Sequence, residues 1–533
     1  MKKICVMVML ALGIFGAAGQ SKNFTLAQSL DIQNSILARL ADEYVDSVKF
    51  DAIMMKGIEA MLAELDPYTV YYPEELEENL EMMTTGIYGG VGAVIKKRVG
   101  EAVVISEPYF GSPAVKAGIQ PGDSIIAIDD IPVYGETSSE SSSRMKGQAG
   151  TTVRFKVVKG RTKDTINYEV LRERIHVSDV PYGAIVRDSV GYIVISGFTQ
   201  NVTRELREKV LELKGQGAKR LVLDLRDNGG GLMDEAVKMA SLFVPVGTMV
   251  VSSKGKADGM TKKYYTKDQP VDTTIPIMVL VNSSTASSSE IVAGALQDLD
   301  RATIAGTRTY GKGLIQSMRP TTYNGTLKLT TGKYYTPSGR CVQAIDYSHR
   351  NSDGSVGHIP DSLTHEFKTK KGRTVKDGGG ITPDITIEGE SYSRTAYSLV
   401  VNDILGEYAI RYFVSHPQIA PVAEFSLSDA EYEEFVKYAA AQDVDFRSGL
   451  QAEMDNLVRI AKFDGMYEGC KAELDALTAR VNMGNENLLR ELRKEIQPLL
   501  EHEIVVRYYF SGPATVVAMK DDKQLFKALD SFK

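Results

Sequence analysis

The stretch from Asn282 to Gln316 reads NSSTASSSEIVAGALQDLDRATIAGTRTYGKGLIQ, and the organisation of the chain follows from it. Just upstream, IPIMVLV at 275–281 is a nearly unbroken apolar run, typical of a strand buried on both faces of a mixed or parallel sheet. Just downstream, apolar residues recur at helical spacing: Ile291, Val292, Ala295, Leu296 and Leu299. The serines are therefore expected on a strand-to-helix turn.

Two interpretations of this turn are open. Many hydrolases hold their nucleophile on such a turn, because the backbone is sharply bent and the helix N-terminus offers free N–H groups. Ser287 followed by Glu290 also fits a capping box, in which the hydroxyl only satisfies N–H groups of the first helical turn. Taken alone, the turn favours the capping box.

A second run, GTRTYGKGLIQ at 306–316, places Lys312 between two glycines, with Gln316 four residues later. A lysine drawn into a desolvated pocket has a lowered pKa and can act as a base. A solvent-exposed lysine on a surface turn is the alternative.

Together, the N-x-x-[ST]-A-S-x-S-E turn, the ALQD that follows and the GxRTYGKGxxQ run resemble the carboxyl-terminal processing, or tail-specific, proteases. These are PDZ-containing serine peptidases with a serine-lysine dyad. The resemblance implies that Ser287 is the nucleophile, that Lys312 is its base and that Gln316 orients the lysine. Asp298 is expected to be structural, or to pair with Arg301 at the helix end.

The same resemblance accounts for the absence of histidine from these motifs. All six histidines lie outside these motifs, so a serine-histidine-aspartate triad has no obvious base. A lysine base removes that need, and no metal or organic cofactor is expected.

A DLRxNxGG motif, at 224–231, follows a buried apolar run and precedes a helix expected from Met233 to Phe243. In the family that this chain resembles, Gly229 or Gly230 and the N–H of Ser288 would form the oxyanion hole. A plain left-handed turn is the other interpretation. The motifs YYTPSGR (334–340) and GITPDI (380–385) are also typical of the family, and the polar segment between them is expected to be an inserted surface loop.

From Thr84 to Arg174 the sequence pattern changes from helical to one of short strands separated by glycine-rich turns. GIYGGVG at 86–92 and SPAVKAGIQPGDSIIAIDDIPV at 112–133 are similar to PDZ domains. In these domains a loop presents backbone N–H groups to a peptide's terminal carboxylate, and the peptide adds as a strand to the sheet edge. The loop residues here are Gly89, Gly90, Val91 and Gly92. A nucleotide phosphate site is disfavoured because no helix of a βα unit follows the loop.

The first residues suggest that the protein is exported, and helical domains are expected on both sides of the central domains. MKKICVMVMLALGIFGAAGQ resembles a signal peptide cleaved after Gly19, and no later segment is long enough for a membrane span. Residues 20–83 are expected to form a helical domain that helps dimerise or gate. Residues 390–533 are expected to form another, with a capped helix at Ser428-x-x-Glu431. Cys341 and Cys470 are interpreted as structural.

The predicted fold is multidomain α/β, with a PDZ-like domain (84–174) before a crotonase-like mixed α/β catalytic domain (175–389). The predicted function is an exported, periplasmic or cell-envelope serine endopeptidase that recognises protein C-termini. Its partners are polypeptides with free C-termini, with a homodimer or an adaptor protein as further possibilities. A net charge of −7 gives no electrostatic case for nucleic-acid binding. The alternative is a catalytically silent PDZ scaffold.

Overall fold

The computed structural model describes residues 22–97, 100–257, 259, 261–389, 391–444, 446, 450–481 and 484–532. The chain forms two compact units, Met1–Tyr71 and Tyr72–Lys533. The predicted signal peptide, with Cys5, lies outside the described residues.

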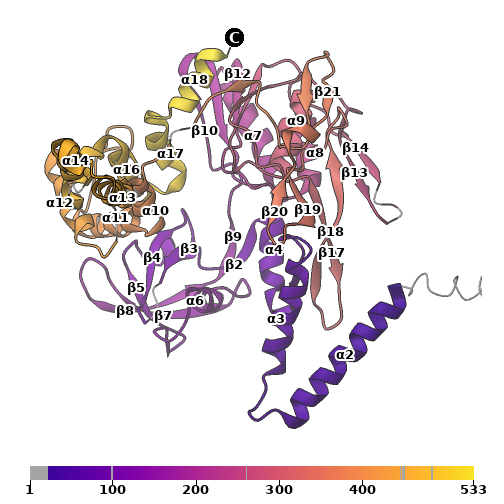
Figure 1. Ribbon diagram of the computed structural model, residues 1–533, viewed down its shortest axis with the longest axis horizontal. Helices are drawn as coiled ribbons and strands as arrows, with labels where there is room; N and C mark the ends of the chain where they lie inside the picture. The colour runs from indigo at the N-terminus through magenta and orange to yellow at the C-terminus, as the bar shows by residue number, and fades with distance from the viewer. Residues whose placement is uncertain are drawn as a thin grey trace, which may run out of the picture. The chain divides into compact units, whose positions relative to one another are not determined.

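The first unit is helical. It contains α2 (Lys22–Glu43), α3 (Phe50–Ala63) and the start of β1 (Val70–Tyr72) (Figure 1). Asp66 closes a turn after α3, because its carboxylate accepts hydrogen bonds from the N–H groups of Tyr68 and Thr69, each at 2.8 Å. Apolar side chains on both helices are exposed: Phe24, Leu26, Leu30, Ile32, Ile36, Ile53 and Met61.

The second unit begins with η1 (Glu74–Leu76) and α4 (Glu77–Thr85), and continues into the predicted PDZ-like domain. This domain is an antiparallel sheet of order β3-β4-β5-β7-β8, in which β6 pairs with β5. The bounds are β3 (Ala93–Lys96), β4 (Val103–Pro108), β5 (Ser124–Ile128), β6 (Ile131–Pro132), β7 (Thr152–Val158) and β8 (Thr165–Leu171), with helices α5 (Pro113–Lys116) and α6 (Ser138–Met145).

The strands that enter and leave this domain pair with each other. β2 (Ile87–Gly90) runs antiparallel to β9 (Glu173–His176), with Gly89 opposite Arg174. The chain therefore passes into and out of the domain through one two-stranded ladder. Helix α6 begins within the polar run ETSSESSS (136–143) and is capped by Thr137, which forms a capping box with Glu140.

The central sheet of the predicted catalytic domain has the order β10-β11-β12-β15-β16-β23. β10 is antiparallel to β11, and every other neighbouring pair is parallel. All five residues of β15 are buried, which confirms the strand predicted from IPIMVLV. The bounds are β10 (Tyr182–Val186), β11 (Val190–Val194), β12 (Arg220–Asp224), β15 (Ile277–Val281), β16 (Thr303–Gly306) and β23 (Ile385–Thr386), with η2 (Arg187–Ser189) between β10 and β11.

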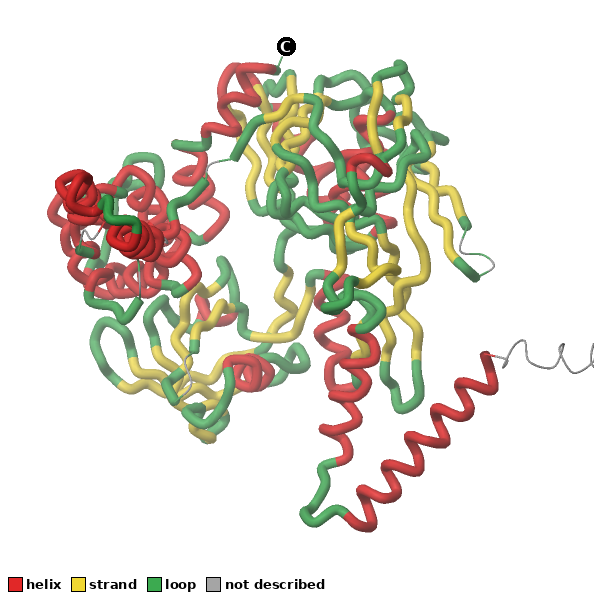
Figure 2. The backbone as a smooth tube through the Cα atoms, viewed as in Figure 1, coloured by secondary structure: helices red, strands yellow, loops and turns green. Residues whose placement is uncertain are grey.

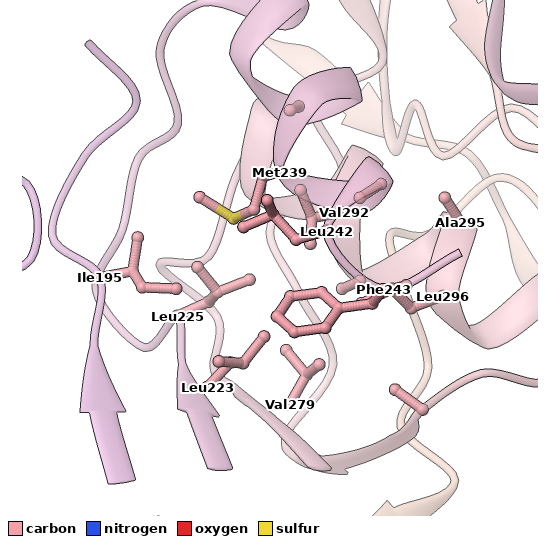
Figure 3. Close-up of a cluster of buried hydrophobic side chains, with 14 of the residues drawn as sticks. Ile195, Leu223, Leu225, Met239, Leu242, Phe243, Val279, Val292, Ala295 and Leu296 are labelled. Carbon is pink, nitrogen blue, oxygen red and sulfur yellow. The ribbon is translucent and has the colours of Figure 1, made fainter. Parts of the chain in front are cut away.

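One face of this sheet packs against α7 (Val202–Gly215), α8 (Met233–Ser241) and α9 (Ser288–Asp298). Figure 3 shows side chains of β12 and β15 meeting those of α8 and α9 around Phe243. This buried layer fixes the turns at the carboxyl ends of β12 and β15 relative to each other. Those turns carry the DLRxNxGG and serine motifs.

The opposite face is covered by the last helix of the chain, α18 (Lys523–Ser531), drawn in yellow beside β12 in Figure 1. Leu525, Ala528, Leu529 and Phe532 are buried against sheet residues such as Val222 and Met278. The end of the segment predicted as a separate helical domain thus packs on the central sheet.

A second, largely antiparallel sheet joins β18 (Thr326–Tyr335) to β13 (Met249–Gly255) and β17 (Leu314–Pro320), and β14 (Lys262–Tyr265) pairs with β13. The segment predicted as an inserted surface loop is more ordered than expected. It contains the antiparallel pairs β19 (Ile345–Arg350) with β20 (Val356–His358) and β21 (Glu366–Lys368) with β22 (Thr374–Lys376), around η3 (Asp361–Leu363).

Most of the remaining helices share an apolar core, and two of them pack on each other in a smaller cluster around Met454, Ala461 and Leu474. Figure 2 shows these helices in red. The capping box predicted at Ser428 is confirmed, with Glu431 accepting from the Ser428 N–H at 2.8 Å. The chain from Leu450 does not form one continuous helix, because Gly465, with a φ of 70°, ends one helix before the next begins. The bounds are α10 (Arg394–Val401), α11 (Ile404–Ser415), α12 (Asp429–Ala440), α13 (Leu450–Phe463), α14 (Tyr467–Val481), α15 (Asn485–Glu491), α16 (Arg493–Tyr509) and α17 (Ser511–Lys520).

No helix among the described residues combines the length and apolar character that crossing a bilayer requires.

Candidate active site

Ser287 lies on the turn between β15 and α9, with φ 57° and ψ −116°. Positive φ is strained for a residue with a side chain, and a simple N-cap serine has extended backbone angles, as Ser428 has with φ −67° and ψ 165°. Two buried side chains brace the turn: Thr285 donates its hydroxyl to the Leu225 carbonyl at 2.8 Å, and Tyr334 donates its hydroxyl to the Ser287 carbonyl at 3.1 Å. A strained serine held in this way has the geometry of a nucleophile elbow.

Glu290, weighed from sequence only as a capping partner, joins the serine turn to the lysine turn. Its Oε2 accepts hydrogen bonds from the backbone N–H groups of Ser287 at 2.9 Å and Lys312 at 2.8 Å. Its Oε1 accepts from the Gly311 N–H at 2.7 Å and the Thr309 hydroxyl at 2.6 Å. Full burial raises the pKa of the Glu290 carboxyl, and the four donated hydrogen bonds oppose that shift because they stabilise the anion.

Steric crowding requires glycine on both sides of Lys312. A Cβ on Gly311 would stand 2.4 Å from the Ala344 Cβ, and one on Gly313 would stand 2.8 Å from the Gln343 backbone nitrogen. The Gly313 N–H also donates to the Gln343 side chain at 2.7 Å. The turn is therefore packed into the domain rather than extended on its surface, and Lys312 is half-buried.

Gln316 lies on β17, the strand that follows the lysine turn. Its side-chain amide donates to the Thr330 hydroxyl on β18 at 3.2 Å, which holds the half-buried side chain against the neighbouring strand.

The loop of the DLRxNxGG motif lies against the serine turn. The Asn228 carbonyl accepts from the Ala286 N–H at 3.0 Å and from the Ser289 hydroxyl at 3.0 Å. Gly230, with φ 95°, approaches so closely that a Cβ there would stand 2.8 Å from the Ser288 backbone nitrogen. The motif is thus both a left-handed turn and a direct neighbour of the predicted nucleophile.

The N–H groups of this loop are not equivalent. The Gly230 N–H donates to the Asn228 side-chain oxygen at 2.8 Å. No hydrogen bond from the N–H of Gly229 or Ser288 to another described residue is present. Of the two glycines named in the sequence analysis, Gly229 is therefore the one whose N–H group donates to no other described residue.

Asp298, at the end of α9, pairs with Arg340 rather than with Arg301. Asp298 Oδ1 lies 2.9 Å from Arg340 Nη2, and both side chains are almost fully buried. Arg301 instead donates to the Phe243 carbonyl at 2.7 Å. The pairing predicted with Arg301 is wrong because Arg340 of the YYTPSGR motif folds back onto α9, which sequence separation conceals.

The PDZ-like loop is shaped by close backbone packing. A Cβ on Gly89 would stand 2.1 Å from the Gly147 carbonyl oxygen, and one on Gly92, where φ is 72°, would stand 2.5 Å from the Ser112 Cβ. Gly89 and Gly90 belong to β2, whereas Val91 and Gly92 lead into β3. Among the described residues, the N–H groups of Val91 and Gly92 donate to no hydrogen bond.

The described residues contain no cluster of three or more histidine, cysteine, aspartate or glutamate side chains that could hold a metal ion.

Comparison with known proteins gives three domain matches. The profile described as "Peptidase family S41" matches residues 189–348, and one described as "PDZ domain" matches residues 83–170. A third, described as "Probable PDZ-protease, C-terminal helical domain", matches residues 395–532.

Similar proteins match about three fifths of the chain. The chain is 35% identical over 314 residues to a "Carboxy-terminal-processing protease" of Bartonella bacilliformis, a match that covers 58% of this chain and 71% of that protein. It is 33% identical over 324 residues to a "Probable CtpA-like serine protease" of Staphylococcus aureus, covering 60% of this chain and 64% of that protein. Among solved structures, the photosystem II D1 C-terminal processing protease is 28% identical, with a TM-score of 0.35, covering 66% of this chain and 85% of that one.

Proposed function

The chain belongs to peptidase family S41, among the carboxy-terminal-processing serine proteases, and on this basis we propose that it is an exported endopeptidase with a Ser287–Lys312 dyad. In this proposal the PDZ domain binds the free C-termini of polypeptide substrates. The resemblance of residues 1–19 to a signal peptide supports export to the periplasm or cell envelope.

In the proposed reaction, the neutral Lys312 amine accepts the proton of the Ser287 hydroxyl as the serine oxygen attacks a peptide carbonyl. The N–H groups of Ser288 and Gly229 donate to the oxyanion that forms. The lysine then gives its proton to the leaving amine, and an acyl-enzyme remains on Ser287. Water hydrolyses this ester with Lys312 again as the base, which restores the serine.

The observation that carries the proposal is the Glu290 carboxylate. One carboxylate oxygen accepts the N–H groups of both Ser287 and Lys312, so the two turns are fixed to each other through a buried anion. Tyr334 adds a second link, since its hydroxyl binds the Ser287 carbonyl and its N–H donates to the Gly313 carbonyl at 2.9 Å. Fixing two reacting groups in this way lowers the entropic cost of catalysis.

Gln316 is proposed to orient the Lys312 amine through its side-chain oxygen. Its amide nitrogen is held by Thr330 on the adjacent strand, so the carbonyl end has a defined direction. This role follows from the family resemblance at Gln316.

The alternative function is a catalytically silent scaffold that uses the PDZ domain only to bind polypeptides. The strained backbone at Ser287 disfavours it, because a scaffold has no use for the cost of that conformation, about 1–3 kcal/mol.

The decisive experiment is digestion of an unfolded model protein by the purified enzyme, with Ser287→Ala as the control. Cleavage by the wild type and not by the variant is expected. Equal cleavage by both would trace the activity to a contaminant or another nucleophile, and binding without cleavage by both would favour the scaffold.

A further inference from the structure

Arg226, the arginine of the DLRxNxGG motif, bridges the central sheet and the C-terminal helix. Its guanidinium binds the Asp224 carboxylate, with Nη2 2.6 Å from Oδ2, and also the Asp522 carboxylate, with Nη2 2.6 Å from Oδ2 and Nη1 3.1 Å from Oδ1. Nη1 donates further to the Gln524 side-chain oxygen at 3.1 Å. All three charged side chains are largely buried, with exposures of 16%, 6% and 15% for Arg226, Asp224 and Asp522.

The partners from the C-terminal segment are themselves held in place. Asp522 caps α18 by accepting the Leu525 N–H at 2.8 Å. The Gln524 side-chain nitrogen donates to the Ile387 carbonyl at 2.7 Å. Because α18 is packed on the sheet by its apolar residues, these two polar groups have a defined position relative to β12.

The residues after Arg226 lead directly to the reacting groups. Asp227 has φ 59°, its N–H donates to the Asn282 side chain at 3.0 Å, and its carboxylate accepts from the Asn282 amide at 2.9 Å. Asn282 begins the serine turn. Gly229 and Gly230 follow, and Gly230 packs on Ser287 and Ser288.

We propose that Asp522 and Gln524 are positioning residues for catalysis: through Arg226 they hold the loop that supplies the oxyanion donor, so the C-terminal segment completes the catalytic centre. This inference rests on the proposed function and extends it. A bidentate Arg–carboxylate pair is rigid as well as strong, and Asp227 and Asn282 transmit the position of Arg226 to the loop. The segment matched as a helical domain thus ends in a part of the peptidase itself.

The test compares Asp522→Asn with Asp530→Asn, a control on the same helix whose carboxylate pairs with Arg187 at an exposed site. Asparagine keeps the cap of α18 and nearly the same volume but removes the charge and one acceptor facing Arg226. Three quantities are measured on the full chain: the thermal midpoint, kcat and KM on an unfolded protein, and the rate of Ser287 labelling by a fluorophosphonate, which loses fluoride as the serine oxygen bonds to phosphorus.

For Asp522→Asn, kcat and the labelling rate are expected to fall by about 100-fold with KM unchanged, because small displacements of a reacting group cost that much. Asp530→Asn should match the wild type. The conservative variant Asp522→Glu should restore part of the labelling rate.

The inference would be overturned if Asp522→Asn had the same labelling rate and kcat as the wild type, whether or not its thermal midpoint were lower. That result would show that the Arg226–Asp522 pair only anchors α18. If Asp522→Asn does not fold, Gln524→Met serves instead, because it keeps the volume and removes the acceptor for Arg226; unchanged kcat there would equally overturn the inference. Failure of the wild type to cleave the unfolded protein, or equal cleavage by Ser287→Ala, would instead refute the proposed function.

Discussion

At the scale of single residues, the candidate site depends on polar contacts between turns that are distant in sequence. Ser287 and Lys312 are held by one buried carboxylate, and the flanking glycines allow the lysine turn to pack inward. The two proposed reacting groups and the carboxylate that holds them can therefore be tested separately.

The first prediction concerns the dyad. Ser287→Ala and Lys312→Ala should each abolish turnover of an unfolded protein, with the thermal midpoint retained. Lys312→Arg should fail as well, because guanidinium does not lose its proton near neutral pH. Rapid cleavage by Lys312→Ala would show that another group is the base.

A second prediction concerns Glu290. In Glu290→Gln, one of the two oxygens is replaced by an NH₂ group that faces N–H or O–H donors, so the link between the two turns should loosen. We expect kcat to fall by about 100-fold and the free energy of unfolding to fall by about 1–3 kcal/mol for the unsatisfied donors.

The matched control is Glu431→Gln, which changes the same position of the capping box at Ser428, far from the dyad in sequence. It should leave kcat unchanged. Equal loss of kcat in both variants would show that Glu290 acts only through general stability. Full activity of Glu290→Gln in a folded protein would show that the link between the two turns is not needed for turnover.

The dyad also predicts a pH dependence. The base must be neutral to accept the serine proton, so the fraction of active enzyme rises with pH. The rate of cleavage should follow a single titration whose midpoint lies below about 10.4, the value of an unperturbed lysine. A midpoint near about 6.5 that disappears on mutation of a histidine would identify a histidine as the base.

At the scale of elements, the PDZ domain offers β3 as a sheet edge beside α6. β4 pairs with one side of β3, and the loop Gly89–Gly92 leads into its start. A peptide added to β3 would bring its terminal carboxylate to the N–H groups of Val91 and Gly92.

Substrates that end in a free carboxylate after a small or aliphatic residue should accordingly be cut faster than the same chains ending in an amide or in aspartate. The measurement is the initial rate on matched pairs of substrates. Equal rates for acid and amide would remove C-terminal recognition from the proposed function.

A short C-terminal peptide added in trans separates two explanations of this gain. If the domain tethers substrate at a local concentration of roughly millimolar, the free peptide should compete and inhibit. If peptide binding shifts the catalytic domain toward an active arrangement, the peptide should stimulate cleavage of an unrelated substrate.

At the scale of the whole molecule, the first unit exposes large apolar side chains on both of its helices. Leu26 and Leu30, one helical turn apart on α2, are 61% and 51% exposed. Contiguous exposed apolar patches mark interaction surfaces, and the homodimer expected from the sequence stays a prediction that can be tested at these two leucines.

We predict that the double variant Leu26→Glu/Leu30→Glu shifts the protein toward monomer in sedimentation experiments. Leu211→Glu is the matched control, since Leu211 is an isolated 53% exposed leucine on α7 of the second unit. A wild type that is monomeric at all concentrations would refute the dimer and leave an adaptor protein as the candidate partner.

Several features followed from the sequence alone because they depend on local order along the chain. The apolar run before the serine turn has the composition of a buried parallel strand, and it is one. Ser428-x-x-Glu431 predicted a capped helix, which the structure confirms. The motifs of residues 84–174 and of the serine and lysine runs indicated a PDZ domain and a tail-specific protease. The domain matches and the similar curated protein agree.

Tertiary structure decided the features that depend on contacts between distant segments. The role of Glu290 could not be separated from helix capping by spacing alone, because its other partners, Thr309, Gly311 and Lys312, lie 19 to 22 residues away. Asp298 was expected beside Arg301, its near neighbour, but the buried Arg340 reaches it from a later motif.

The C-terminal helix shows most clearly which features local sequence predicts and which features tertiary contacts decide. The sequence predicts helices over residues 390–533, and α18 is one of them, with one apolar face. Which surface that face would cover was open, because burial of apolar area is non-directional and any exposed apolar sheet can satisfy it. The directional contacts of Asp522 and Gln524 with Arg226, formed only in the folded chain, assign α18 to the central sheet and thus to the catalytic domain.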